Sequence, residues 1–322
     1  MTTRGGVTAV PAVLTVGEAL VAAVPTGPVT LEACDELRTH VGGAEVNVAV
    51  GLVRLGVPCR FVGRVGDDPL GRRVAAHLLA EGVDVRRLRR DPRPTGLYLR
   101  EWLPDGARRP YYYRTGSAGS GLVPSDVPAD LDGCALVHLT GITTALGPGP
   151  RAAVERAVDL ASRAGVPVSF DANYRPALWP AGEFLACVRP LLGSVAILFV
   201  GEEEAELLFG TSEPAEVFVQ ARDAGVGTCV LRRAERGACA LEDGAGIVER
   251  RAPATAVDPV GAGDAFDAGF LAAHLAHAPL HGCLAVGVHC GARAVEVPGE
   301  HDGAPTRGSL PEDLRALLDA GG

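Results

Sequence analysis

A glycine turn followed by an aspartate is the most informative feature of this 322-residue sequence, in the stretch Asp258-Pro259-Val260-Gly261-Ala262-Gly263-Asp264. Gly261 and Gly263 let the backbone turn sharply and approach a ligand closely, because they carry no Cβ. Residues 265–275 are rich in Ala, Phe and Leu and predict a helix, so the free N–H groups of the turn could bind a phosphate. Phosphate would repel an aspartate there unless the residue had a task. We therefore interpret Asp264 as a general base for an attacking hydroxyl, with helix capping as the alternative.

A second glycine segment also leads into a helix. Gly42 and Gly43 precede residues 45–55, in which Val46, Ala49, Val50 and Val53 recur at helical spacing. Asn47 lies in the first turn, where its amide could hydrogen-bond a ligand above the glycines. The alternative is a solvated polar residue near a helix start.

Together these two segments resemble the signature regions of the ribokinase-like (PfkB) carbohydrate kinases, and the resemblance spans nearly the whole chain. It implies transfer of the γ-phosphoryl group of ATP to a sugar hydroxyl, with Mg²⁺ as cofactor. By position it implies that Asp264 is the base and that Gly261, Ala262 and Gly263 stabilise the transferred group.

Composition limits the chemistry further. The net charge of −9 argues against a nucleic-acid partner. All 30 basic residues are arginine, which excludes Schiff-base chemistry and a P-loop lysine. The eight cysteines are scattered without a C-x-x-C pair, so we expect buried free thiols rather than disulfides or a metal site. No apolar run is long enough for a signal sequence or a membrane span, and we expect a cytoplasmic protein with no membrane partner.

The remaining pattern predicts a doubly wound α/β fold with a largely parallel sheet, as one domain over residues 1–322. Apolar runs predict strands over residues 12–16, 59–63, 136–139, 166–170, 196–200 and 228–231. Helical segments at residues 45–55, 69–80, 151–164, 202–209 and 214–224 lie between most of them.

A small β-sheet lid is expected to cover the site, with segments at about residues 20–40 and 84–114. Residues 97–103 and 109–114 read as β segments joined by the turn Pro104-Asp105-Gly106. A lid would exclude water from the reactive phosphate, whereas the alternative is an ordinary edge hairpin. An exposed lid edge could also pair with a second copy of the chain.

The predicted substrate follows from two arginines that each follow a tyrosine, Arg114 and Arg175. Strand alternation puts Tyr112 and Arg114 on one face, as it does Tyr98 and Arg100, and Arg175 follows a strand at the edge where open α/β sheets bind ligands. A neutral hexose gives no reason to place two arginines there, whereas guanidinium grips a carboxylate through two bonds. Surface ion pairs are the alternative for either arginine alone.

These stretches closely resemble 2-keto-3-deoxygluconate kinases within the family. That resemblance implies a sugar-acid site, and Glu300 or Asp302 aligns near it more loosely. The implied lining residues are Gly42, Gly43, Asn47, Tyr98, Tyr112, Arg114, Ile142 and Arg175.

The nucleotide side departs from the family pattern. The resemblance implies nucleotide contacts at Gly201, Arg232, Gly237, Gly261 and Gly263, and a Mg²⁺ contact through water at Glu204. Gly201 stands where the family has Asn or Ser, and Ala234 where a glycine is common. These departures put donor preference in doubt.

The predicted function is ATP-dependent phosphorylation of the terminal hydroxyl of a sugar acid, most like 2-keto-3-deoxygluconate. A fructokinase or phosphosugar kinase is the runner-up, and a non-catalytic sugar-acid sensor is the alternative from another class. A Rossmann dehydrogenase is discounted, since no G-x-G-x-x-G follows the first strand.

Overall fold

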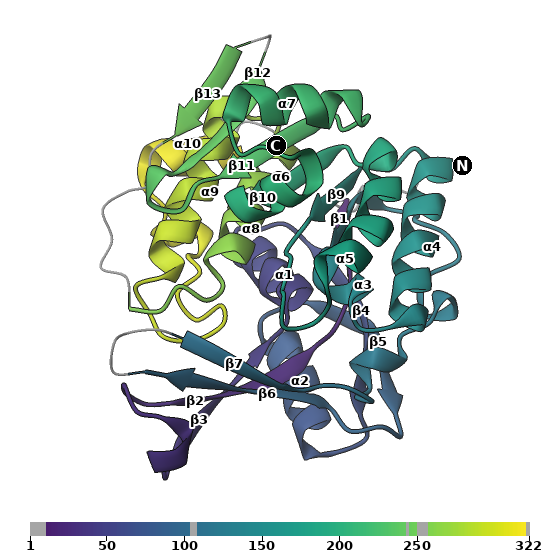
Figure 1. Cartoon of the computed structure of the whole chain (residues 1–322), viewed down its shortest axis with the longest axis vertical. Helices are drawn as coiled ribbons and strands as arrows, with labels where there is room; N and C mark the ends of the chain where they lie inside the picture. The colour runs from purple at the N-terminus through teal and green to yellow at the C-terminus, as the bar shows by residue number, and fades with distance from the viewer. Residues whose placement is uncertain (1–10, 104–107, 243–244, 250–256, 320–322) are drawn as a thin grey trace, which may run out of the picture.

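A nine-stranded sheet forms the centre of the molecule, in the order β13-β12-β11-β10-β9-β8-β1-β4-β5 (Figure 1). The computed structural model describes residues 11–103, 108–242, 245–249 and 257–319. All pairs from β5 to β11 are parallel, whereas β12 and β13 add antiparallel strands at one edge. The strands are β1 (Ala12–Val16), β4 (Cys59–Gly66), β5 (Asp84–Asp91), β8 (Cys134–Thr140), β9 (Val168–Asp171), β10 (Ile197–Gly201), β11 (Thr228–Arg232), β12 (Ala238–Glu242) and β13 (Ala245–Glu249).

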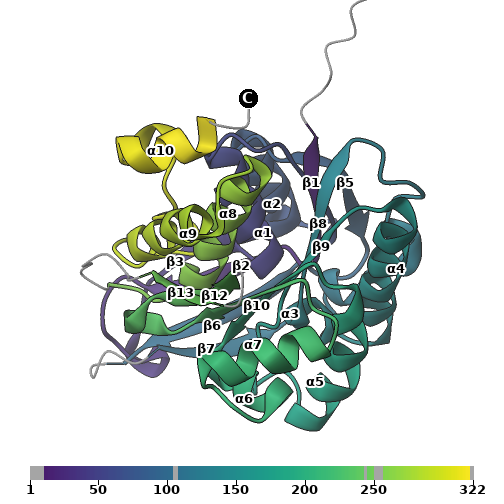
Figure 2. The same cartoon turned by 90° about the horizontal axis from the view of Figure 1, so that it is seen from above.

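Helices cover both faces of this sheet, so the predicted doubly wound, largely parallel α/β class is confirmed (Figure 2). One core packs α1 (Ala44–Arg54), α2 (Pro69–Ala80), α8 (Ala262–Leu275), α9 (Leu280–Ala294) and α10 (Glu312–Asp319) against one face. The other core packs α4 (Pro148–Ala164), α5 (Ala181–Val188), α6 (Glu202–Phe209) and α7 (Pro214–Asp223). Their apolar residues are almost fully buried, which supplies the main driving force for this layered arrangement.

A separate four-stranded sheet lies over one end of the large sheet, as Figure 1 shows. Its order is β3-β2-β6-β7, from β3 (Leu37–Gly42), β2 (Leu20–Pro25), β6 (Gly96–Trp102) and β7 (Arg108–Tyr113). We call it the lid sheet. The lid range predicted to begin at residue 84 was wrong at its start, because β5 pairs in parallel with β4 in the large sheet. The predicted turn at residues 104–106 lies outside the described residues.

Most predicted elements agree with the structure to within a few residues. The helix predicted at residues 202–209 is α6, and the one predicted at 151–164 is α4, which begins three residues earlier at Pro148. All eight cysteines are free thiols, five of them buried, whereas Cys34, Cys134 and Cys187 are partly exposed. In the described part of the chain, no helix has the length and apolar character to cross a membrane.

Candidate active site

Two cavities meet at the turn before α8. The first has a volume of 410 Å³ and lies between the lid sheet and the carboxyl ends of the parallel strands. The second has a volume of 340 Å³ and extends between α6 and helices α8 and α9. Glu204, Arg232 and Gly263 line both cavities. Ligands of open α/β sheets bind at this edge, so the two cavities could hold two substrates side by side.

The turn itself depends on close backbone packing. Gly261 is the residue before α8 and has φ of +75°, in the left-handed region that favours glycine. A Cβ on Gly261 would lie 1.9 Å from the carbonyl oxygen of Glu300, and one on Gly263 would lie 2.9 Å from the Arg232 guanidinium. The turn therefore presents the N-terminal N–H groups of α8 to the junction of the cavities, which suits an anion.

Replacing Gly261 by alanine should displace this turn, because the new Cβ would collide with the Glu300 carbonyl. We expect kcat to fall at least about tenfold, since small misplacements of catalytic groups are costly. Steady-state kinetics with MgATP would measure the effect. Gly182→Ala is the matched control, because a Cβ there meets nothing within 4 Å, and it should leave kcat unchanged.

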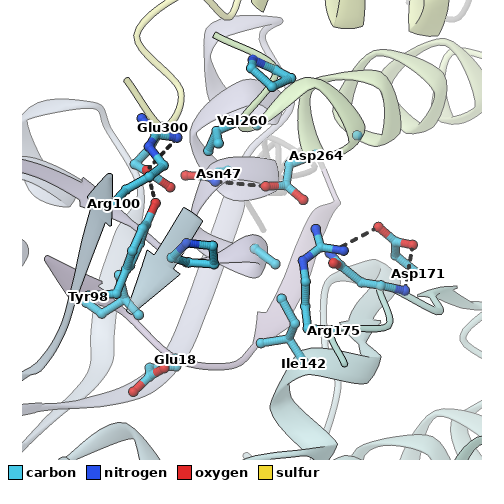
Figure 3. Close-up of a pocket in the computed structure, with 18 of the residues that line it drawn as sticks. Glu18, Asn47, Tyr98, Arg100, Ile142, Asp171, Arg175, Val260, Asp264 and Glu300 are labelled. Carbon is cyan, nitrogen blue, oxygen red and sulfur yellow. Dashed lines mark hydrogen bonds and ion pairs between the residues drawn. The ribbon is translucent and has the colours of Figure 1, made fainter. Parts of the chain in front are cut away.

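Asp264 lies in the first turn of α8 and faces the first cavity. Asn47 Nδ2 donates a hydrogen bond of 2.8 Å to its Oδ2, and Figure 3 shows the two side chains facing each other. Burial raises the pKa of Asp264 to about 7, while the hydrogen bond from Asn47 opposes that rise. A carboxylate with such a pKa can accept a proton near neutral pH, which suits a general base.

The lid sheet supplies the aromatic wall of the first cavity. Tyr98 and Tyr112 are opposite each other on β6 and β7, with ring centroids 5.9 Å apart. The Tyr98 hydroxyl donates a hydrogen bond to Glu300, a contact drawn in Figure 3. The predicted shared faces of Tyr98 with Arg100 and of Tyr112 with Arg114 are confirmed, since all four residues line the cavity.

The arginines of this cavity differ in their partners. Arg114 is buried and ion-paired with the buried Glu18, and Arg100 is ion-paired with Asp258 at 2.6 Å. Arg175 is exposed, and its Nη1 donates to the Tyr174 carbonyl at 3.0 Å. Within the described ranges no carboxylate lies in ion-pair contact with Arg175, although Asp264 is near enough to interact with it electrostatically. This guanidinium is therefore better able to bind an anionic ligand than Arg114, whose charge is already neutralised.

The second cavity is lined by both acidic and apolar residues. Gly201 to Glu204, Ala234 and Gly237 line one side, and Phe266, Val288, Ala292 and Val295 line the other. Arg232 at its boundary is held by Asp171 at 2.6 Å and Asp267 at 2.9 Å. Ala234 has φ of 47°, so it occupies a left-handed conformation at the position where the family commonly has glycine. The apolar walls suit a planar base.

The junction of the cavities also suits a magnesium ion. Glu204 contributes a carboxylate to the first cavity, and Asn173, which also lines it, has a buried Oδ1 without a hydrogen-bond partner. Asp171 lines the cavity too, but both of its oxygens accept hydrogen bonds from Arg232. Mg²⁺ prefers oxygen ligands and keeps several of its waters. Both oxygens of Glu204 accept backbone hydrogen bonds, from Tyr174 and Gly201, so a contact through water fits this carboxylate better than direct ligation.

The structure brings most of the predicted site residues together. The first cavity contains Gly43, Asn47, Tyr98, Tyr112, Arg114, Ile142, Arg175, Gly261 and Asp264, and the second contains Gly201, Gly237 and Ala262. Gly42 does not line either cavity, because it packs against the Glu300 side chain instead. Of the two loosely aligned acids, Glu300 lines the first cavity, whereas Asp302 pairs with His40.

Sequence reasoning missed Glu18 and Asn173 as residues of the first cavity, and it did not assign Arg100 to the site. A signal existed for Arg100, which shares a strand face with Tyr98. Glu18 is a single acid next to a buried strand, and nothing local connects it to Arg114.

Comparisons with known proteins agree with this geometry. The model of the pfkB family carbohydrate kinases matches residues 11–307. A 2-dehydro-3-deoxygluconokinase from Thermoproteus tenax is 35% identical over 303 residues, covering 92% of this chain and 91% of that protein. A Klebsiella pneumoniae fructokinase is 33% identical over 307 residues, covering 92% and 97%. An Escherichia coli protein assigned as a ribokinase II, solved with ATP and Mg²⁺, superposes with a TM-score of 0.87 at 25% identity, covering 96% and 99%.

Proposed function

This chain belongs to the pfkB family of carbohydrate kinases, and from that premise we propose that its acceptor substrate is a sugar acid, most like 2-keto-3-deoxygluconate. As a member of that family the protein is a sugar kinase that uses ATP. The first cavity would hold the sugar acid and the second the nucleotide, with the turn at residues 261–264 between them.

One observation carries the choice of a sugar acid. Arg175 presents an exposed guanidinium to the same cavity as Asp264, and no carboxylate of the described residues is in ion-pair contact with it. A neutral hexose offers nothing to such a group, whereas a carboxylate can accept two parallel hydrogen bonds from it. The similarity to a 2-dehydro-3-deoxygluconokinase supports the same substrate class.

In the proposed mechanism Asp264 accepts the proton of the acceptor hydroxyl as that oxygen bonds to the γ-phosphorus of ATP. The bond from the γ-phosphorus to the bridging oxygen breaks, and ADP leaves with its electron pair. N–H groups at the start of α8 stabilise charge on the transferred group. Bound Mg²⁺, held through water by Glu204 and near Asn173 Oδ1, would neutralise phosphate charge. Tyr98, Tyr112 and the rest of the lid sheet exclude water from the acceptor side.

A fructokinase remains the second candidate, since the Klebsiella relative is almost as similar as the Thermoproteus one. For a neutral sugar, Tyr98 and Glu300 would bind hydroxyls and Arg175 would have no partner on the acceptor. Membership of a kinase family favours catalysis over a non-catalytic sensor. A cytoplasmic location and pairing of two chains through the lid edge stay predictions.

ADP release with MgATP over a small acceptor panel tests the proposal. We expect turnover with 2-keto-3-deoxygluconate to exceed that with gluconate, fructose, fructose 6-phosphate and ribose. The reason is that fructose, fructose 6-phosphate and ribose lack a carboxylate, whereas gluconate has one but lacks the 2-keto and 3-deoxy features of the acid named for the Thermoproteus relative. Faster turnover of fructose would keep the kinase and reject the sugar acid. Preference for fructose 6-phosphate would assign Arg175 to a phosphate instead.

A further inference from the structure

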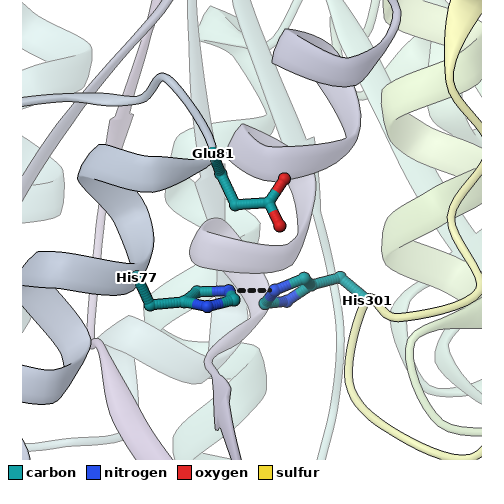
Figure 4. Close-up of side chains that lie close together, drawn as sticks. All are labelled: His77, Glu81 and His301. Atoms are coloured by element: carbon teal, nitrogen blue, oxygen red, sulfur yellow. Dashed lines mark hydrogen bonds between the residues drawn. The ribbon is translucent and has the colours of Figure 1, made fainter.

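A chain of hydrogen bonds leads away from the base toward the surface. Asn47 Nδ2 donates to Asp264, and Asn47 Oδ1 lies 2.9 Å from Nδ1 of His301. His301 Nε2 lies 2.7 Å from Nε2 of His77, as Figure 4 shows. Asn47 and His301 are each 4% exposed, whereas His77 on α2 is partly exposed. The proposed mechanism uses neither histidine.

The directions of these bonds are linked. While Asp264 is ionised it can only accept, so the amide nitrogen of Asn47 must face it and the amide oxygen must face His301. Nδ1 of His301 must then carry a hydrogen. In neutral His301 the Nε2 atom is consequently an acceptor, and the shared hydrogen belongs to Nε2 of His77.

The same chain of hydrogen bonds can also form with every donor and acceptor exchanged. With the Asn47 amide turned over, its oxygen would face Asp264, which could make that bond only in its protonated form. The amide nitrogen would then donate to His301 Nδ1, and His301 would donate to His77. The two histidine tautomers are therefore coupled to the ionisation of Asp264 through the orientation of one amide.

We propose that His301 and His77 are positioning residues that hold the Asn47 amide nitrogen toward Asp264 and so set the pH range over which Asp264 acts as the base. The inference rests on the proposed role of Asp264. Burial keeps the pKa of His301 at about 4 and lowers that of His77, so both rings are neutral near pH 7.

The charges around the two histidines act in opposite directions on their protonation. Arg54 of α1 forms a bidentate ion pair with Glu81 at the end of α2, at 2.9 and 2.8 Å, and also donates to the His301 carbonyl at 2.7 Å. Asp302 lies next to His301 and pairs with His40 of β3. Arg73, on the same helix as His77, opposes its protonation. Glu81 and Asp302 thus favour protonation of the pair, Arg54 opposes it, and burial keeps the rings neutral. Around Asp264 itself, Asp171 raises the pKa, whereas Arg175 and Arg232 lower it.

A metal ion is a weaker explanation of the same cluster. Donor atoms of His77, Glu81 and His301 all lie within 4.8 Å of one another. However, the two ring nitrogens lie at hydrogen-bond distance, and Arg54 already occupies both oxygens of Glu81. A divalent cation would have to separate the rings and lie close to the Arg54 charge.

The test compares His301→Leu with His301→Asn, whose amide nitrogen can still donate to Asn47. In His301→Leu we expect the acid-side pKa of kcat/KM to rise by about one unit, the effect of one neutral hydrogen bond. Because the base is active when deprotonated, activity should fall about fivefold at pH 7 and recover near pH 9. His301→Asn should keep the original profile. His77→Leu should shift the profile in the same direction as His301→Leu, and His77→Gln, which can donate from the position of Nε2, should restore it.

Several outcomes would overturn the proposal. An equal loss of activity at every pH in His301→Leu would indicate that His301 is only structural. An unshifted pH profile in both His301→Leu and His77→Leu would show that neither histidine positions Asn47. His289→Leu on α9 is the control for loss of a partly exposed helical histidine and should not shift the profile. Stoichiometric Zn²⁺ binding that His77→Leu abolishes would assign the cluster to a metal.

A measurement independent of turnover separates this inference from the proposed function. Nitrogen-15 shifts of the histidine rings report tautomers directly, with His301 identified by its loss in His301→Asn. We expect the Nδ1–H tautomer of His301 at pH 8. The Nε2–H tautomer at that pH would reject the relay even if Asp264 proved to be the base.

Discussion

Asp264→Asn is expected to lower kcat by at least about 100-fold, because the amide cannot accept the proton of the attacking hydroxyl. The substitution is nearly isosteric, so the turn before α8 and the cavity walls should keep their form. KM for ATP should change little, since Asp264 does not bind the nucleotide in the proposed mechanism. Initial rates over a range of both substrates would measure kcat and both KM values.

The control for loss of one carboxylate is Asp67→Asn, at an exposed position before α2. It should retain wild-type kinetics. Turnover of Asp264→Asn within a few-fold of the wild type would remove Asp264 from the role of base. Calorimetric titration with ATP would show whether binding survives in the variant.

Arg175→Ala should raise KM for the sugar acid by about 10-fold to 100-fold, with a much smaller change in KM for ATP. The range follows from about 1.5–3 kcal/mol for a charge-assisted hydrogen bond. Arg175→Lys should recover only part of the loss, because an ammonium group cannot form the two parallel bonds of a guanidinium. Arg163→Ala, at an exposed arginine of α4, is the matched control. Equal effects of Arg175→Ala on both substrates would contradict the carboxylate contact.

Arg114→Ala should destabilise the folded protein, unlike Arg175→Ala, because the two arginines have different partners. Arg114 is paired with the buried Glu18, so its removal leaves a buried carboxylate uncompensated. The structure therefore weakens the expectation that Arg114 and Arg175 bind the substrate carboxylate together. Arg175 keeps that proposed role, and Arg114 is better described as fixing the cavity wall.

Local patterns predicted much of the fold and of the site. Strand alternation placed Tyr98 with Arg100 and Tyr112 with Arg114, because side chains of a strand point to opposite faces with a period of two. The glycine turn and the apolar run after it located the N-terminus of α8. These inferences need only neighbouring residues.

Contacts between distant segments were beyond such reasoning. His301 and Asn47 are 254 residues apart in sequence, and the Glu18–Arg114 pair joins the end of a buried strand to the end of the lid sheet. The sheet that β5 joins is also decided by tertiary pairing, since its sequence fits either sheet. No local period of hydrophobic residues encodes these partners.

The segment from Gly299 to Ala304 joins three parts of the molecule that have different tasks. Through the Glu300 side chain it reaches the lid, through the Glu300 carbonyl it abuts Gly261, and through His301 it reaches Asn47. The proposed acceptor site, the turn before α8 and the proposed base are therefore supported by adjacent residues. An attempt to redesign acceptor specificity at Glu300 would disturb proton transfer as well, whereas changes at Arg175, on a different loop, leave this support intact. Directed evolution of new acceptors should accordingly accumulate substitutions around residue 175 and on the lid strands, and conserve residues 299–304.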